Sequence, residues 1–354
     1  MEKPDIISKY RDALMGFAML WIVFDHSGLN FGTGFLGYII RFIKQTGWLG
    51  VDIFFFVSGF GLMAGWYKKK SSLLFFYKRR FLRIMPIFWF FFAVDLILQA
   101  LSKDVWSPGT VFINFTGLSF FIQGSYHWFI SAILLCYLIF PFFANYFQKS
   151  QDKLKLLIYI ISSCLIFAII ISVSELLYAN ELNKFLIVIL RLPAFFIGAA
   201  IGYIYINNNN NNNNIKFKYI FKLYPHVLLT FFCYATLALI FYITSAEIRH
   251  LYGLYWYPFV ISAFSLTFLL SFVFSYLHQT RLEPFINYLN NIGKSSLDLY
   301  FIHSLLFYKI VSIKVMFNSV GLFLDGNLLW IFVIIISIIL SLKFNQVFSK
   351  RIFS

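Results

Sequence analysis

The chain has 354 residues and a formal net charge of +15; 60% of its residues are hydrophobic and only 12% are charged. Soluble domains carry about 25% charged residues, so this composition excludes an ordinary soluble enzyme, a disordered chain and a disulfide-rich secreted module. We therefore predict an all-α polytopic membrane protein, organised as one domain over residues 1–354. In such a protein, excess positive charge reflects topology and anionic lipid headgroups rather than a nucleic-acid partner.

Apolar stretches long enough to cross a bilayer as helices recur along the chain. We predict about ten transmembrane helices, at residues 13–30, 48–66, 84–101, 128–147, 155–173, 185–206, 224–244, 254–277, 297–316 and 328–346. Lys and Arg concentrate in alternate connections, and the positive-inside rule then places both termini in the cytoplasm. The eight asparagines at 207–214 have no apolar face, so we predict a flexible cytoplasmic linker there.

Ionisable groups inside membrane spans are costly, and they mark candidate functional sites. Ionisable side chains lie in the outer parts of four predicted spans: Asp25 and His26 in the first, Asp52 in the second, His127 at the start of the fourth, and Arg191 in the sixth. The aromatic residue Trp128 follows His127 directly. We expect these polar groups to converge on one outward-facing cavity.

A neutral histidine held by a carboxylate is a general base suited to a hydroxyl substrate near pH 7. Asp25 precedes His26 directly, and adjacent helical side chains point about 100° apart, so Asp25 does not easily reach the ring. Asp52, at a similar depth, is therefore the predicted orienting partner. The alternative is a polar pair that only holds two helices together.

A second cluster, in the segment FYKRRFLRIMPIFW, faces the cytoplasm. Arg80 and Arg83 are three residues apart and share a helical face, and their guanidinium forks suit phosphate geometry. The alternative is a topology anchor that touches lipid headgroups. His303 is a lone histidine on an apolar helix, a setting typical of a structural group. No motif of a soluble enzyme and no metal-ligand spacing is present.

Six motifs appear in a familiar order: LMGFAMLWIVFDHSG, GWLGVDIFFFVSGFGL, FYKRRFLRIMPIFW, HWFISAILLCYLIFP, RLPAFFIG and NIGKSSLDLYFIHSLLF. Together they cover nearly the whole chain, and the sequence resembles the membrane-bound acyltransferase-3 family. Members of that family O-acylate cell-surface and exported glycans. The chain departs from the common pattern at Met15, where many members have Arg, and at Ile133 and Leu134, where many have acidic residues.

The resemblance implies roles for several residues. It makes His26 the catalytic histidine, places Asp52 in a Gly-Val-Asp motif, and assigns Arg80 and Arg83 to the acyl-CoA donor. Support of the acceptor or oxyanion is expected from three residues: His127, Trp128 and Arg191. Further candidates are Asp25 and the residues of a late Tyr-x-x-His motif, Tyr300 and His303.

The function implied by this resemblance is acyl transfer, with acetyl as the expected group, from cytoplasmic acyl-CoA to a hydroxyl of a glycan or lipid-linked saccharide. His26 would act as general base, and no tightly bound cofactor is expected. The resemblance also implies a multi-pass protein of the bacterial inner (cell) membrane, in contact with membrane lipids. The alternative is a transporter or flippase-like carrier that uses His26 and Asp52 as a proton relay.

Overall fold

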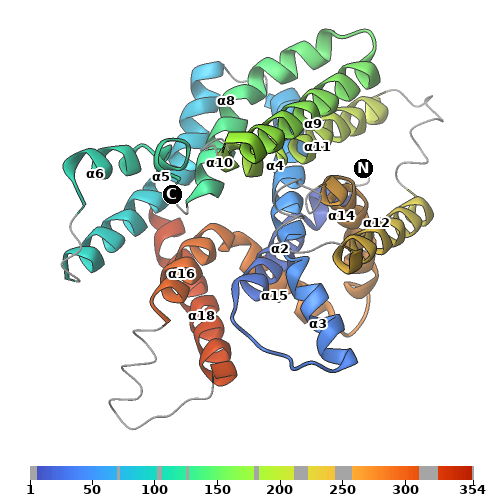
Figure 1. Cartoon of the computed structure of the whole chain (residues 1–354). Helices are drawn as coiled ribbons and strands as arrows, with labels where there is room; N and C mark the ends of the chain where they lie inside the picture. The colour runs from blue at the N-terminus through green and yellow to red at the C-terminus, as the bar shows by residue number, and fades with distance from the viewer. Residues whose placement is uncertain are drawn as a thin grey trace.

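The computed structural model describes residues 6–69, 72–101, 106–124, 127–178, 183–210, 222–243, 257–310 and 326–352 (Figure 1). Helices make up all the regular secondary structure in these ranges, and no strand occurs within them. The predicted all-α class is therefore confirmed.

The helices follow one another in chain order as α1 (Ile6–Lys9), α2 (Arg11–His26), α3 (Phe35–Gln45), α4 (Trp48–Lys69), α5 (Leu73–Leu101), α6 (Pro108–Phe115), α7 (Ser119–Gln123), α8 (Trp128–Lys149), α9 (Lys153–Tyr178), α10 (Asn183–Ile189), α11 (Leu192–Asn210), α12 (Leu223–Ile243), α14 (Tyr257–Leu277), α15 (Glu283–Lys294), α16 (Ser296–Tyr308) and α18 (Gly326–Ile352). Each of the ten predicted spans coincides with one or two of these helices over most or part of its length.

Seven helical segments of the described chain are long and apolar enough to cross a membrane: Phe35–Tyr67, Leu73–Leu101, Trp128–Lys149, Lys153–Ser172, Phe185–Asn207, Leu223–Ile240 and Gly326–Val347. A shorter apolar helix covers Ile261–Leu277. The chain is thus a polytopic membrane protein. The count of ten spans and the cytoplasmic termini stay predictions, and residues 1–5 and 353–354 lie outside the described ranges.

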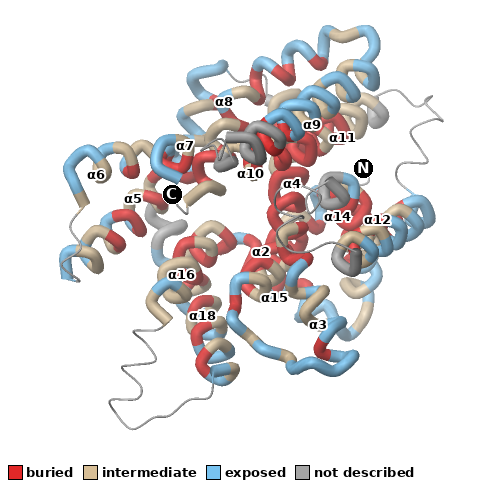
Figure 2. Tube along the Cα trace, in the orientation of Figure 1, coloured by how far each residue is buried: buried red, intermediate tan, exposed pale blue. Residues whose placement is uncertain are grey.

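Along α9 and α12 many residues are exposed, as the pale blue of both helices indicates (Figure 2), and large apolar side chains are among them. They include Ile158, Ile166, Phe167 and Ile170 on α9, and Phe231, Phe232 and Leu239 on α12. Helices satisfy their own backbone hydrogen bonds, so they can expose such faces to hydrocarbon at no polar cost. These two faces are consistent with contact to lipid.

Four short helices, α3, α6, α7 and α15, occupy segments that the span prediction left as connections. The asparagine run also differs from the prediction. Helix α11 continues through Asn207 to Asn210, where the linker was expected to begin, and 211–214 lie outside the described residues.

Helices α2 and α15 cross with their backbones in direct contact. A Cβ atom added at Gly16 would overlap the carbonyl oxygen of Leu289, and one added at Gly293 would overlap the carbonyl oxygen of Asp12. Only glycine permits this approach, which resembles small-residue packing in membranes. The contact fixes α15, and with it the start of α16, against α2.

Helices α4 and α11 make a second close crossing. A Cβ at Gly59 would overlap the carbonyl oxygen of Phe195, and a Cβ at Gly198 would overlap that of Phe56. Helix α2 also packs against α4, where Gly50 faces the carbonyl oxygen of Ala18. Helix α4 is therefore held between α2 and α11, and these helices form the buried centre of the fold (Figure 2).

Candidate active site

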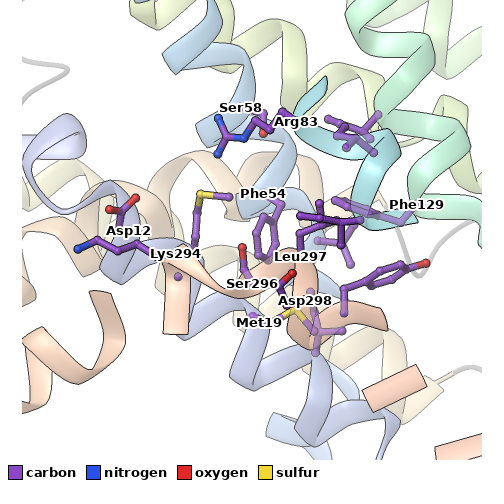
Figure 3. A pocket seen from close by; sticks show the side chains of 18 of the residues that line it. Asp12, Met19, Phe54, Ser58, Arg83, Phe129, Lys294, Ser296, Leu297 and Asp298 are labelled. Atoms are coloured by element: carbon purple, nitrogen blue, oxygen red, sulfur yellow. The ribbon is translucent and has the colours of Figure 1, made fainter. Parts of the chain in front are cut away.

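A cavity of about 680 Å³ lies among α2, α4, α5, α8 and the junction of α15 with α16 (Figure 3). Along α2 it is lined by residues at helical spacing: Arg11, Met15, Met19, Ile22 and His26. At 1.5 Å per residue, this stripe measures about 22 Å from Arg11 to His26. The cavity therefore follows α2 from its first residue to its last.

Cations gather where α2 begins. The cavity lining there contains Arg11, Arg79, Arg80, Arg83 and Lys294. Arg11 pairs with its neighbour Asp12 at 3.4 Å, whereas Arg80 and Arg83 have no ion pair with a carboxylate within the described residues. Arg11 and Arg83 are close enough to repel each other electrostatically. Arg79, Arg83 and Lys294 are exposed, and Arg11 and Arg80 are partly buried. The carboxylates of Asp12 and Asp298 also line the cavity, so cations outnumber anions there, and such an excess of positive charge in a cleft is suited to bind an anion.

Arg80 is held between two aromatic rings. Its guanidinium carbon lies 5.6 Å from the ring centre of Phe76 and 5.8 Å from that of Tyr137. Its Nε is buried without a hydrogen-bond partner in the described part of the chain. Cation–π contacts hold the planar group in place without neutralising its charge, so the guanidinium remains available to an anion.

Two of the three residues that depart from the family pattern, Met15 and Ile133, also border the cavity, whereas Leu134 does not. Met15 lines it one helical turn above Arg11, so a cation is present on the same face of α2, one turn earlier than in many members. Ile133 lines the cavity too, without a carboxylate. Ser131 instead donates a hydrogen bond of 2.7 Å from Oγ to the carbonyl oxygen of Gly117. That bond holds α8 against the turn between α6 and α7.

At the other end of the cavity His26 is exposed, and the lining also contains Asp25, Trp48, Trp128 and Tyr300. The rings of Trp48 and Trp128 stack with centroids 6.1 Å apart and an interplanar angle of 30°. This end thus combines one imidazole with several aromatic faces.

The ring of His26 contacts His303 of α16. His26 Nδ1 lies 3.1 Å from His303 Nε2, and the two rings are nearly parallel, at 16°. His303 has no exposed surface, and its Nδ1 lies 2.8 Å from the carbonyl oxygen of Leu299. The prediction that Asp52 holds the ring of His26 is therefore wrong in geometry.

Asp52 pairs instead with Arg191. The two side chains form a salt bridge, and both have an exposed fraction of 0%. The Arg191 guanidinium also lies 5.5 Å from the ring centre of Trp48. Neither residue lines the cavity. Opposite charges at matching depths were visible in the sequence, but the prediction assigned both residues to the cavity rather than to each other.

His127 also lies outside the cavity lining, unlike its neighbour Trp128. Its ring packs edge-on against Phe88 at 5.9 Å and lies 6.0 Å from the ring of Phe301. The carboxylate of Asp95 acts on it electrostatically. Of the outer polar groups expected to converge, the cavity therefore gathers Asp25 and His26, together with Trp128.

Within the ranges that the structure describes, no three His, Cys, Asp or Glu residues are grouped so as to hold a metal ion. Comparison of the chain with curated proteins and with solved structures gave no match. The family model Acyl_transf_3, described as an acyltransferase domain, matches residues 9–345, which include the cavity and both histidines. The chain therefore belongs to the acyltransferase-3 family and is an integral membrane acyltransferase.

Proposed function

We propose that this protein transfers an acyl group, most simply acetyl, from cytoplasmic acyl-CoA to a hydroxyl of a cell-surface or exported glycan. The observation that carries this proposal is that one cavity joins the cation cluster at the start of α2 to His26 at its end. The family match supports acyl transfer and gives no support to a transporter. The proposed location is the inner (cell) membrane of a bacterium, where acyl-CoA is available on the cytoplasmic side.

The cation cluster suits the phosphates of the donor. Coenzyme A carries a pyrophosphate and a separate phosphate, and arginine forks bind such groups with charge-assisted hydrogen bonds. The Arg80 and Arg83 side chains share a face of α5, and Arg11 faces them from α2. The donor's long, narrow arm would then extend along the apolar side chains of Met15, Met19 and Ile22 towards His26, which lies about 22 Å along α2 from Arg11.

The thioester would reach His26, where the chemistry takes place. His26 removes the proton from the acceptor hydroxyl, the oxygen attacks the thioester carbonyl, and the carbon–sulfur bond breaks as the coenzyme A thiol takes up the proton. The carbonyl oxygen becomes an anion in the transition state, and the indole N–H of Trp128 is the proposed hydrogen-bond donor to it. The Trp48 and Trp128 rings offer apolar faces on which a sugar ring can pack.

The donor assignment is tested by binding measurements on purified protein. We expect Arg80→Ala/Arg83→Ala to weaken acyl-CoA binding strongly but to leave the binding of acyl-pantetheine, which lacks the phosphates, unchanged. Lys78→Ala is the matched control, because Lys78 is an exposed cation of the same helix that does not line the cavity. Equal acyl-CoA affinity in the double variant and the control would refute the donor site.

The acceptor is tested separately, by mass analysis of surface polysaccharide from cells with and without the gene. The proposal predicts the loss of acetyl mass increments on saccharide units, with restoration by the wild-type gene and not by His26→Ala. Unchanged polysaccharide mass would refute the glycan assignment without affecting the donor site.

A further inference from the structure

The contact between His26 and His303 determines which nitrogen of His26 carries a proton. His303 Nδ1 lies 2.8 Å from the carbonyl oxygen of Leu299. A carbonyl oxygen only accepts hydrogen bonds, so the neutral ring of His303 must carry its proton on Nδ1 and donate it to Leu299. Its Nε2 is then an acceptor.

The same reasoning extends to His26. Because His303 Nε2 accepts, His26 Nδ1, at 3.1 Å, must be the donor. In neutral His26 the remaining nitrogen, Nε2, then has a free lone pair. His26 is exposed and lines the cavity, whereas His303 has no exposed surface and lies behind it. The hydrogen bonds therefore run in one direction, from His26 Nδ1 to His303 and from His303 Nδ1 to the carbonyl oxygen of Leu299. His26 Nε2 is left as the basic nitrogen.

The other charged groups near His26 do not take this role. Asp25 lines the same cavity, but within the described residues His26 Nδ1 contacts His303 and forms no ion pair with Asp25. Asp52 is bound to Arg191. Lys44 of α3 acts on His26 electrostatically and also interacts with Asp25. Because Lys44 is a cation, it cannot accept a proton from Nδ1.

We propose that His303 is a positioning residue that holds the proton of His26 on Nδ1, so that Nε2 is the atom that receives the proton of the acceptor hydroxyl. This inference rests on the proposed role of His26 as general base. When Nε2 takes the proton, the electron pair of the O–H bond forms the new carbon–oxygen bond, and His26 becomes an imidazolium with both nitrogens protonated. Nδ1 keeps its hydrogen bond to His303, which stays neutral. The proton then leaves with the coenzyme A thiol.

The packing of α2 against the α15–α16 segment supports the contact between His26 and His303. Gly16 contacts Gly293 where α2 meets α15, and His26 contacts His303 ten residues further along both segments. Helix α2 and the α15–α16 segment therefore run side by side in the same direction, for about 15 Å at the rise of a helix. The close glycine contact sets the height at which His303 faces His26.

Two substitutions separate positioning from packing. His303→Gln places an amide oxygen near the position of Nε2, where it can accept the hydrogen bond from His26 Nδ1. His303→Leu fills similar space but accepts nothing. We expect the leucine variant to lose roughly 10²-fold or more in kcat, as when a histidine base loses its tautomer-fixing partner. The KM for acyl-CoA should be unchanged, and the glutamine variant should recover much of the rate.

The tautomer itself can be observed by ¹⁵N NMR of histidine-labelled protein. Wild type should show His26 protonated on Nδ1, and His303→Leu should shift the population towards protonation on Nε2. His226→Leu is the matched control, because it removes an equally buried imidazole that does not line the cavity. Its kcat and the His26 tautomer should not change.

The outcomes distinguish this inference from the proposed function. Near-normal kcat in His303→Leu that binds acyl-CoA, alongside an inactive His26→Ala, would overturn the inference and leave the proposed function standing. Equal loss in the glutamine and leucine variants with an unchanged His26 tautomer would also overturn it. If His303→Leu does not insert, the glutamine variant decides by the same tautomer measurement. An active His26→Ala would instead refute the base assignment itself.

Discussion

Removal of one partner of the Asp52–Arg191 pair should destabilise the protein without altering the pH dependence of acyl transfer. Asp52→Asn keeps the shape of the side chain but leaves the Arg191 charge uncompensated. Both side chains have 0% exposure, so water cannot replace the lost partner. The effect should therefore appear in stability rather than in the behaviour of His26, whose ring contacts His303.

The magnitude follows from burial. Breaking a fully buried ion pair by removing one partner costs about 3–5 kcal/mol, whereas replacing both partners with apolar residues of similar volume is close to neutral. We therefore expect Asp52→Asn to lower Tm by roughly 6 °C or more, on the scale of larger soluble domains. The double replacement Asp52→Leu/Arg191→Met should recover most of that loss.

Thermal unfolding in detergent can be followed with a thiol-reactive fluorophore, because Cys136 and Cys233 are buried and become accessible on unfolding. Asp12→Asn is a matched control. Its carboxylate also pairs with an arginine, Arg11, but the two side chains are 35% and 30% exposed, so its loss should cost about 1 kcal/mol or less.

Two results would refute this reasoning. An unchanged Tm in Asp52→Asn would mean that the buried pair does not hold α4 to the segment before α11. A shifted pH–rate profile in correctly folded Asp52→Asn would mean that Asp52 acts on His26 despite its salt bridge.

His26→Ala should lower acyl transfer by about 10²–10⁴-fold while equilibrium binding of acyl-CoA stays normal. Weakened binding would contradict the proposal that the cation cluster binds the donor and that His26, at the other end of the cavity, serves only the chemistry. Trp48→Ala should raise the KM for the acceptor but not for acyl-CoA, as steady-state kinetics with each substrate varied will show. Trp128→Ala should do the same and should also lower kcat, because it removes the proposed hydrogen-bond donor to the oxyanion. Gly16→Val should drive a side chain into the carbonyl of Leu289 and lower Tm; a stable variant would contradict the close crossing.

The helices were largely predictable because a helix that crosses the bilayer needs a long stretch of apolar residues. Each predicted span coincides with helix in the structure. The short helices α3 and α15 were missed because each is too short to span, so an apolar-length criterion ignores it. Amphipathic periodicity in those segments was the available signal.

The pairing of side chains was less predictable, because it depends on contacts between residues far apart in the sequence. With both termini in the cytoplasm, the predicted span 297–316 begins at the cytoplasmic side, so His303 falls in its inner half, whereas His26 falls in the outer half of the first span. The structure brings them together because α15 already lies along α2 at Gly293. Helix α16 therefore starts part of the way along α2, and not at the edge of the membrane. Span boundaries predicted from hydropathy do not show where α16 starts relative to α2.

The separation of His26 and His303 by 277 residues has a consequence for biosynthesis. The chain is made from its N-terminus, so the cations of α2 and α5 are inserted early, while α16 is among the last helices to leave the ribosome. A nascent or C-terminally truncated chain therefore contains the cation cluster but lacks the contact between His26 and His303. Under the proposed function, such a chain would carry the donor-binding cations without an oriented base, and we expect it not to hydrolyse acyl-CoA.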